Sequence, residues 1–217
     1  MTTSLRAIGA GCILATLTLV TGCTESGGDD AQTTPTQVTM ELRPVAFVGA
    51  SANAVELLPS ESEDWPQFLE GLGLPGSDDA VSAATWVAAG DCAAEPVTTP
   101  DVAAACSEDG TEVFLLGAVA LDQSNIASVE QMDDQNADTT ASLTFDESGS
   151  AALAKLTREA TSLQEPRNRI AITIDGAVVS APAVAEEITV GQVQIVGAET
   201  GVTGEESSIQ ALVDSVS

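Results

Sequence analysis

The side chains that most enzymes use for proton transfer and nucleophilic attack are scarce in this chain. Its 217 residues include no His and no Tyr, and Lys155 is the single lysine. A Ser-His catalytic triad is therefore impossible, and a serine–lysine pair would have to use Lys155. That lysine lies in a segment with the apolar spacing of an amphipathic helix, one turn before Glu159. We expect Lys155 to be a solvated residue beside Glu159, and we expect no enzymatic activity.

Acidic side chains in adjacent pairs are the remaining candidates for acid–base chemistry. The pairs are Asp29 with Asp30, Asp78 with Asp79, and Asp133 with Asp134. Adjacent residues do not face a common point on a helix or a strand, so we interpret these pairs as solvated loop residues. Glu61, Glu63 and Asp64 lack the spacing of a calcium-binding EF-hand, and zinc would need more thiol or imidazole ligands than remain. We expect neither a metal site nor a cofactor.

The first 22 residues indicate a lipoprotein signal peptide. Arg6 gives a positive start, and the apolar run that follows is shorter than the roughly 20 residues of a membrane-spanning helix. The run ends in Val20, Thr21, Gly22 and Cys23, which resembles a bacterial lipobox. We predict that Cys23 is lipidated and that two or three acyl chains hold the protein on the extracytoplasmic side of a bacterial cell membrane. An ordinary signal peptide with an incidental cysteine is the alternative.

The chain is strongly acidic, with 33 Asp and Glu against six Lys and Arg and a net charge of −27. Without residues 1–22, five basic side chains would oppose the same 33 acidic ones, a net charge of −28. Nucleic acid binding depends on cationic side chains that displace counterions, so we exclude a nucleic acid partner. Anionic lipid headgroups would repel this chain too, so membrane attachment would have to come from the lipid anchor.

Two cysteines remain once Cys12 leaves with the signal peptide and Cys23 carries the lipid. In an exported chain, Cys92 and Cys106 are most simply a disulfide that closes a loop of about 15 residues, worth about 3 kcal/mol. Residues 23–37 are rich in Gly, Ser, Thr, Asp, Gln and Pro, and we interpret them as a flexible tether. The ordered domain then comprises an N-terminal part, residues 38–110, which contains the disulfide loop, and a second part, residues 111–217.

The apolar periodicity of the ordered part mixes strands with helices. We expect two helices over 78–89 and 124–131. A third helix is expected after a cap at Asp146 or Ser148, with an apolar stripe that reaches Leu163, and a fourth after a capping box at Thr203 to Glu206. Strands are expected near 38–48, 113–119, 140–145, 170–174, 178–179 and 193–195, and Asp175 with Gly176 predicts a hairpin turn. These elements predict an α+β fold with a mostly antiparallel mixed sheet and packed helices.

The second part of the domain carries a specific resemblance. A hairpin from Asn168 to Pro182 stands a short loop before a strand from Gly191 to Gly197, and Leu115, Leu116 and Gly117 end an earlier strand. In this order the segments resemble the large extracytoplasmic head of SecD, the membrane subunit that assists Sec-dependent protein export. The likeness runs from about Thr111 to Val216. Residues 41–45 resemble the first strand of the same domain, and the cysteine pair resembles one found in some SecD heads.

The resemblance implies a polypeptide-binding head without the transport machinery of SecD. The six membrane helices of SecD, its proton-coupling carboxylate and its Asp-Leu-Gln-Gly-Gly segment have no counterpart in this sequence, and residues 198–202 lengthen one loop. We therefore expect a noncatalytic, SecD-like lipoprotein that binds an exported polypeptide or a Sec translocon subunit. The predicted binding residues share exposed turns and loops: Asp175, Gly176, Glu186, Glu187, Glu199 and Thr200.

A second hypothesis is a surface lipoprotein that reuses the SecD head to bind an unrelated peptide or a cell-wall ligand. It would be favoured if the cluster of Trp65, Phe68, Leu69, Leu72 and Leu74 formed an exposed anchor. We expect instead that a short helix packs these side chains into the core.

Overall fold

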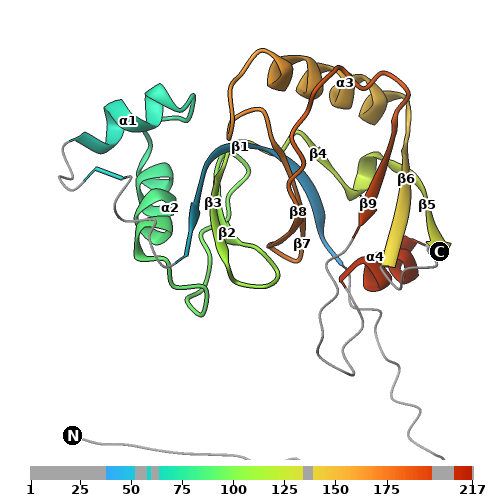
Figure 1. Cartoon of the computed structure of the whole chain (residues 1–217), viewed down its shortest axis with the longest axis horizontal. Coiled ribbons are helices and arrows are strands. Elements are labelled where there is room, and N and C mark those ends of the chain that lie inside the picture. Colours follow the sequence, from blue (N-terminus) through green and yellow to red (C-terminus); the bar gives the residue numbers. More distant parts are fainter. Residues whose placement is uncertain (1–37, 52–57, 60–63, 134–138, 197–207, 217) are drawn as a thin grey trace, which may run out of the picture. The chain divides into compact units, whose positions relative to one another are not determined.

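The computed structural model of the chain describes residues 38–51, 58–59, 64–133, 139–196 and 208–216. All of them belong to one compact unit, Pro35–Ser217. The tether, the predicted lipidation site Cys23, the capping box at Thr203 and the loop with Glu199 and Thr200 lie outside the described residues. Figure 1 shows the arrangement of the elements in space.

The described elements alternate between strands and helices along the chain. The strands are β1 (Met40–Ala50), β2 (Ala103–Cys106), β3 (Glu112–Leu116), β4 (Leu121–Asp122), β5 (Ile126–Asp133), β6 (Thr139–Phe145), β7 (Ile170–Ile174), β8 (Ala177–Ser180) and β9 (Gln192–Val196). The helices are α1 (Trp65–Gly71), α2 (Asp78–Ala89), α3 (Glu147–Thr161) and α4 (Ser208–Val216), with one 3-10 turn at Gln123–Asn125. Antiparallel sheets combined with these helices make the fold α+β, as the sequence predicts.

The larger sheet is built around β1. Its strand order is β2-β3-β1-β7-β8, and the short β4 also pairs with β1. The first half of β1 pairs with β7, whereas its second half pairs with β3. Pro44 stands at this change of partner. A proline has no backbone N–H to donate to a ladder, so it costs least where a ladder is interrupted. The strand therefore arches across the sheet, drawn in blue in Figure 1, and it joins the N-terminal part of the domain to the second part.

The two edges of this sheet meet at one point. The N–H of Glu108, just after β2, donates to the carbonyl of Val178 in β8 at 3.1 Å, and Ser107 forms a parallel bridge with Val178. One aromatic side chain and several small or branched ones fill the inside of the curl, namely Phe114, Val45, Ala103, Ala105, Leu116, Ala171 and Val178. Alanines at β2 allow a tight curvature, because larger side chains would not fit between opposed strands.

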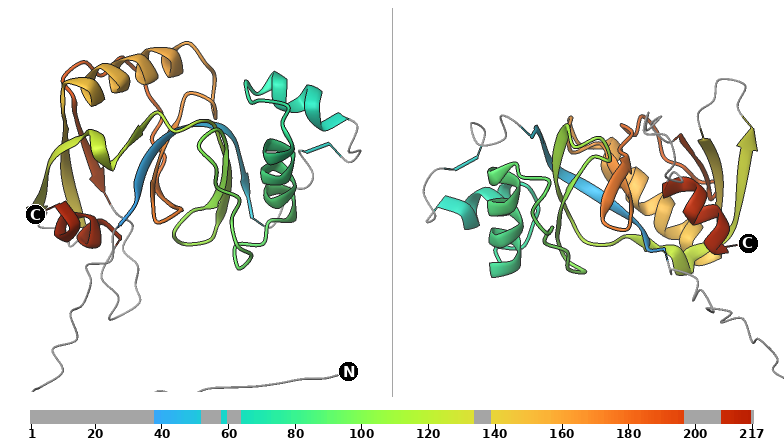
Figure 2. Two further views of the ribbon diagram at one scale, coloured as in Figure 1. Left: turned by 180° about the vertical axis from the view of Figure 1, so that it is seen from behind. Right: turned by 90° about the horizontal axis from the view of Figure 1, so that it is seen from below.

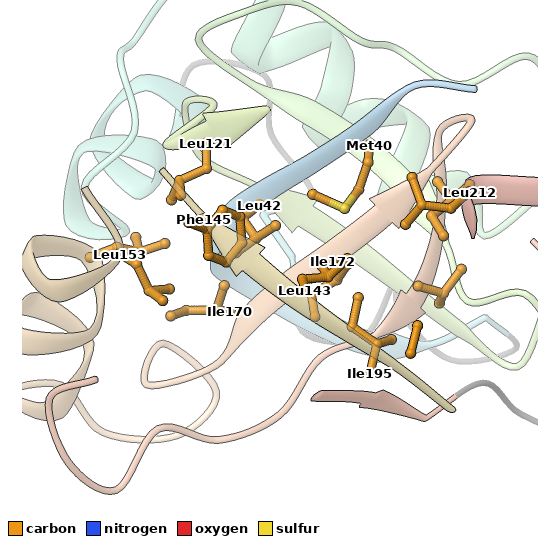
Figure 3. Close-up of a cluster of buried hydrophobic side chains, with 14 of the residues drawn as sticks. Met40, Leu42, Leu121, Leu143, Phe145, Leu153, Ile170, Ile172, Ile195 and Leu212 are labelled. Atoms are coloured by element: carbon orange, nitrogen blue, oxygen red, sulfur yellow. The ribbon is translucent and has the colours of Figure 1, made fainter. Parts of the chain in front are cut away.

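A second sheet of three strands, in the order β5-β6-β9, packs against the first. Leu143 and Phe145 of β6 face Leu42 and Ile172 of the larger sheet, as Figure 3 shows. Helix α3 contributes Leu153 to this core, and α4 contributes Leu212, which is fully buried. The two helices lie at opposite ends of the core (Figures 1 and 2). This core is the largest of the described clusters, and it fixes β9 close to β7.

Helices α1 and α2 cover the other side of β2 and β3. Ser77 caps α2 by accepting the N–H of Ala80, and Gly90 ends the helix in the left-handed conformation with φ of 63°. Alanines and valine on one face of α2 are fully buried against the sheet, namely Ala80, Ala83, Ala84 and Val87. Trp65 is 7% exposed, Leu69 is fully buried and Leu74 is 6% exposed. The prediction that this aromatic and leucine cluster packs into the core is confirmed.

The predicted helix over 124–131 is wrong, because β5 occupies most of this range. Ile126 and Val129 are three residues apart, and this spacing imitates a helical face. In the structure they share the core side because the register with β6 shifts between Ile126 and Ser128, which inserts one extra residue. Across a β-bulge, residues three apart rather than two apart can therefore face the same side of the strand.

The predicted helix after Asp146 is confirmed as α3. The carboxylate of Asp146 accepts the N–H of Gly149 at 2.6 Å, and this hydrogen bond lowers the pKa of Asp146. The apolar stripe ends at Ala160 rather than at Leu163, because α3 stops at Thr161 and Leu163 is 37% exposed. The strand predicted to reach Val119 ends earlier, at Leu116.

Candidate functional site

The predicted turn between β7 and β8 is a tight hairpin turn. Asp175 and Gly176 have φ angles of 49° and 85°. A two-residue turn of type I′ needs positive φ at both central positions, and Asp followed by Gly adopts them at low cost. One carboxylate oxygen of Asp175 accepts the N–H of Thr39 at 2.8 Å and its hydroxyl at 3.0 Å. The Asp175 side chain therefore attaches the hairpin to the start of β1.

A cavity of about 310 Å³ opens beside this turn. We call it the disulfide cavity, because Cys92 and Cys106 line it together with Trp86, Asp175 and Gly176. Cys92 and Cys106 form a disulfide, with Cα atoms 5.9 Å apart, that joins the loop after α2 to the end of β2. The indole N–H of Trp86 is buried and has no hydrogen-bond partner among the described residues. The walls of this cavity are mainly loops and turns.

The predicted residues Glu186 and Glu187 lie on the chain between β8 and β9. Both oxygens of the Glu187 carboxylate accept hydrogen bonds from the guanidinium group of Arg158 on α3, at 3.0 and 2.5 Å. These hydrogen bonds lower the pKa of Glu187 and raise that of Arg158. Glu186 is exposed. The turn at Asp175 lies at the end of the β7–β8 hairpin away from α3 (Figure 1), so the structure places the two predicted groups apart.

A second cavity, also about 310 Å³, lies between α3, β7 and β9, and sequence analysis did not find it. We call it the β9 groove. Its floor is apolar, with Leu42 of β1 and Ile170 and Ile172 of β7. Val184 and Ile188, from the chain between β8 and β9, contribute to its wall, as do Gln192, Val193 and Gln194 of β9. The rim residues Pro182, Gln192 and Gln194 are exposed, so this groove opens to solvent.

One hydrogen bond holds the wall of the β9 groove to α3. Thr157 is fully buried, and its hydroxyl donates to the carbonyl of Leu153 at 2.8 Å. The same hydroxyl oxygen accepts the N–H of Ile188 at 2.9 Å. Thr157 therefore satisfies a backbone N–H that would otherwise lack a protein partner within the described part of the chain. The only sequence signal for this contact was a hydroxyl residue on the apolar stripe of α3.

Arg43 is a buried cation that sequence analysis did not assign a role. Its side chain is 1% exposed and donates to Glu41 at 2.8 Å, to the carbonyl of Gly117 at 2.9 Å and to the carbonyl of Thr99 at 2.7 Å. The planar guanidinium group presents donors from three nitrogen atoms in fixed directions, whereas Lys would present its donors from a single nitrogen atom. Arg43 thus holds two loops to β1, and its partners identify it as a structural residue.

Among the side chains considered for acid–base chemistry, the structure describes Lys155, Asp78 and Asp79, and all three are exposed. Asp29, Asp30 and Asp134 lie outside the described residues. Lys155 Nζ is 4.0 Å from the Glu159 carboxylate, and both side chains are well exposed, as predicted. Asp78 and Asp79 are exposed in the first turn of α2. In the described ranges no three His, Cys, Asp or Glu side chains converge on a point that could hold a metal ion.

A comparison with protein-family models gives one match over more than half of the chain. Residues 100–211 match the model described as the P1 head subdomain of SecDF. The chain belongs to this SecDF P1 head family. The match runs from just before β2 into α4 and includes both candidate cavities in part. Strand β1 precedes the match, although it forms the centre of the larger sheet in this family member.

Solved structures of SecDF are similar to this chain at low sequence identity. SecDF in its super-membrane-facing form has 22% identity and a TM-score of 0.42, and the alignment covers 83% of this chain and 19% of that one. A structure titled as a membrane component SecDF that enhances protein export has the same identity and TM-score, with 63% of its chain covered. SecDF from Thermus thermophilus, titled as a translocon-associated membrane protein, has 20% identity and a TM-score of 0.35 over 82% of this chain and 19% of that chain.

This member of the family therefore spans only part of the SecDF structures that it matches. No curated protein matches the chain. Within the part of the chain that the structure describes, no helix is both long and apolar enough to cross a membrane.

Proposed function

We propose that this protein is a noncatalytic lipoprotein that binds polypeptide on the extracytoplasmic face of a bacterial membrane and assists Sec-dependent export. The observation that carries the proposal is the match of residues 100–211 with the SecDF P1 head subdomain. One similar protein is described as a membrane component that enhances protein export. The partners are then an exported polypeptide or a subunit of the Sec translocon.

The β9 groove supports polypeptide binding better than the predicted turn does. It combines apolar side chains on its floor with polar residues at its rim, which is the usual composition of a ligand-binding cavity. The carboxylates of Asp175 and Glu187, by contrast, already have partners within the fold. Lipidation at Cys23 would keep such a binding head close to the membrane, where an exported chain emerges.

In-cell photo-crosslinking tests this function. A photoreactive amino acid replaces Val190, whose side chain is 79% exposed on the chain between β8 and β9. The matched control carries the same amino acid at Lys155, an exposed position on α3 with 74% side-chain exposure. We expect mass spectrometry to identify exported chains or translocon subunits captured from position 190, and fewer from position 155.

A lipidated, folded protein that captures neither exported chains nor translocon subunits from either position would contradict the export function. A Cys23→Ser variant provides a second control, because loss of the acyl chains releases the protein from the membrane and lowers capture from position 190. The alternative of an unrelated surface ligand depended on an exposed cluster at Trp65. Since that cluster is packed against α2 and the sheet, no described residue favours the alternative.

A further inference from the structure

Strand β9 has an unpaired edge. In the described residues it pairs with β6 alone, in antiparallel register. The N–H of Phe145 donates to the carbonyl of Gly191 at 2.9 Å, so these two residues form a hydrogen-bonded pair. Such pairs alternate along an antiparallel ladder, and Val193 is therefore the next residue bonded to β6. The N–H and C=O groups of Gln192 and Gln194 point to the opposite side, away from β6.

This unpaired edge borders the β9 groove. Gln192 and Gln194 line the groove together with Ile170 and Ile172 of β7, which form its apolar floor. The volume of about 310 Å³ is at the lower end of the range of ligand cavities, about 300–1,000 Å³. Val193 is half-buried on the core side of β9, so the same side of an added strand would face the apolar floor.

We propose that β9 binds its polypeptide by strand addition: an extended segment pairs antiparallel with the free edge and places alternate apolar side chains in the β9 groove. An exposed row of backbone donors and acceptors is complemented by another backbone, and pockets beside the edge select alternate side chains. The inference rests on the proposed polypeptide-binding function and names the mode of recognition. Strand addition predicts that the affinity for the polypeptide depends on backbone hydrogen bonds, whereas binding in a purely apolar groove would not depend on them.

The charge of the chain selects the flanks of the bound segment. The chain has a net charge of −27, and Glu186 is exposed two residues before Ile188 in the groove wall. Basic residues at the ends of the segment are attracted to this surface, whereas acidic ones are repelled. The occupant is thus an extended polypeptide segment with alternating apolar side chains, basic ends and no proline at the paired positions.

A synthetic peptide probe tests this mode on the full-length chain. The probe is Lys-Thr-Val-Thr-Val-Thr-Lys with a fluorescent label, and anisotropy reports its binding. In antiparallel addition the valines face the groove, and the threonine N–H groups donate to β9. N-methylation of the threonines removes these donors, so we expect affinity to fall by about tenfold or more. N-methylation of the valines serves as the matched control and leaves most of the affinity.

A variant of the protein tests the complementary hydrogen bonds, in which a β9 N–H donates to a carbonyl of the probe. Proline in Gln194→Pro removes an N–H that points away from β6, so the ladder within the sheet stays intact. We expect about a tenfold loss of probe affinity in Gln194→Pro. The matched variant Gln194→Ala removes the same side-chain contact with Met132 but keeps the N–H, so its affinity for the probe should stay well above that of Gln194→Pro.

The outcomes separate the mode of binding from the function. Equal affinity for both methylated probes, at a measurable affinity for the unmodified probe, overturns strand addition and leaves polypeptide binding intact. Absence of any probe binding to the folded chain overturns strand addition as well. The export function fails separately, if position 190 captures no exported chain or translocon subunit in cells.

Discussion

The disulfide cavity and the β9 groove have the same volume, about 310 Å³, but they are built differently. Loops and turns form the disulfide cavity, and covalent and hydrogen bonds close them on each other: the Cys92–Cys106 disulfide on one side and the Asp175–Thr39 hydrogen bonds on the other. Two sheets, helix α3 and the chain between β8 and β9 form the β9 groove. Its rim retains backbone groups that no described residue pairs.

Volume alone therefore does not identify a binding site. The binding residues predicted from the sequence include Asp175 and Gly176 in the disulfide cavity, and Glu186 and Glu187 in the loop that leads into the β9 groove. The Asp175–Gly176 turn uses its polar groups to fold the hairpin, so little is left for a partner. At β9 the fold leaves backbone donors and acceptors available. A second chain that pairs with these groups forms hydrogen bonds that stabilise the complex.

Removal of the disulfide should have the largest effect on stability and little effect on the groove. The sequence separation between Cys92 and Cys106 is 14 residues. We expect Cys92→Ser with Cys106→Ser to lower the free energy of unfolding by about 3 kcal/mol, because the unfolded chain regains loop entropy. Urea denaturation measures this change, with the reduced original chain as control. If probe affinity in the β9 groove fell together with stability, the two cavities would not be independent.

Thr157→Val should damage the groove itself. The variant removes the acceptor of the Ile188 N–H inside a buried contact, so we expect about 2 kcal/mol lower stability and weaker probe binding. Thr157→Ser keeps the hydroxyl and should retain both properties. Urea denaturation and probe anisotropy measure the pair of variants. Unchanged probe affinity in Thr157→Val would mean that the wall at Ile188 does not shape the site.

Asp175→Ala should weaken the hairpin of the disulfide cavity by about 1 kcal/mol. The variant removes two hydrogen bonds from Thr39 at an exposed position. Asp175→Asn keeps a side-chain oxygen and a residue that tolerates positive φ, so it should lose less. Thermal unfolding compares the two variants. A large loss of probe binding in Asp175→Ala, with stability preserved, would return the binding site to the turn.

The pair of Glu187 and Arg158 should have the smallest effect, and the effect should depend on pH. Hydrogen bonds from Arg158 lower the pKa of Glu187 below its ordinary value of 4.5, so the folded state favours the ionised carboxylate. This stabilisation is present above pH 4.5 and is lost as the pH falls through the lower pKa of the folded state. We expect Glu187→Gln to melt slightly lower at neutral pH and to match the original chain in acid. A difference that persists in acid would contradict the ion pair.

Local sequence signals predicted several elements because their causes lie within a few residues. Asp146 caps α3 with its own side chain, and the Asp175–Gly176 turn needs only positive φ at two positions. The prediction failed at β5, where Ile126 and Val129 suggested a helix. Only pairing with β6 reveals the extra residue that brings both to the core side.

The acidic character, the absence of His, the α+β class and the resemblance to the SecD head could all be read from the amino-acid sequence. These properties follow from composition, periodicity and local motifs, which need no knowledge of distant contacts. Tertiary structure alone decided the order of the strands, the partners of Asp175 and Glu187, and the position of the groove. The backbone groups of Gln192 and Gln194 face the free edge of β9 because the pairing of Phe145 with Gly191 sets the phase of the β6–β9 ladder, and these two residues are 46 positions apart in the chain.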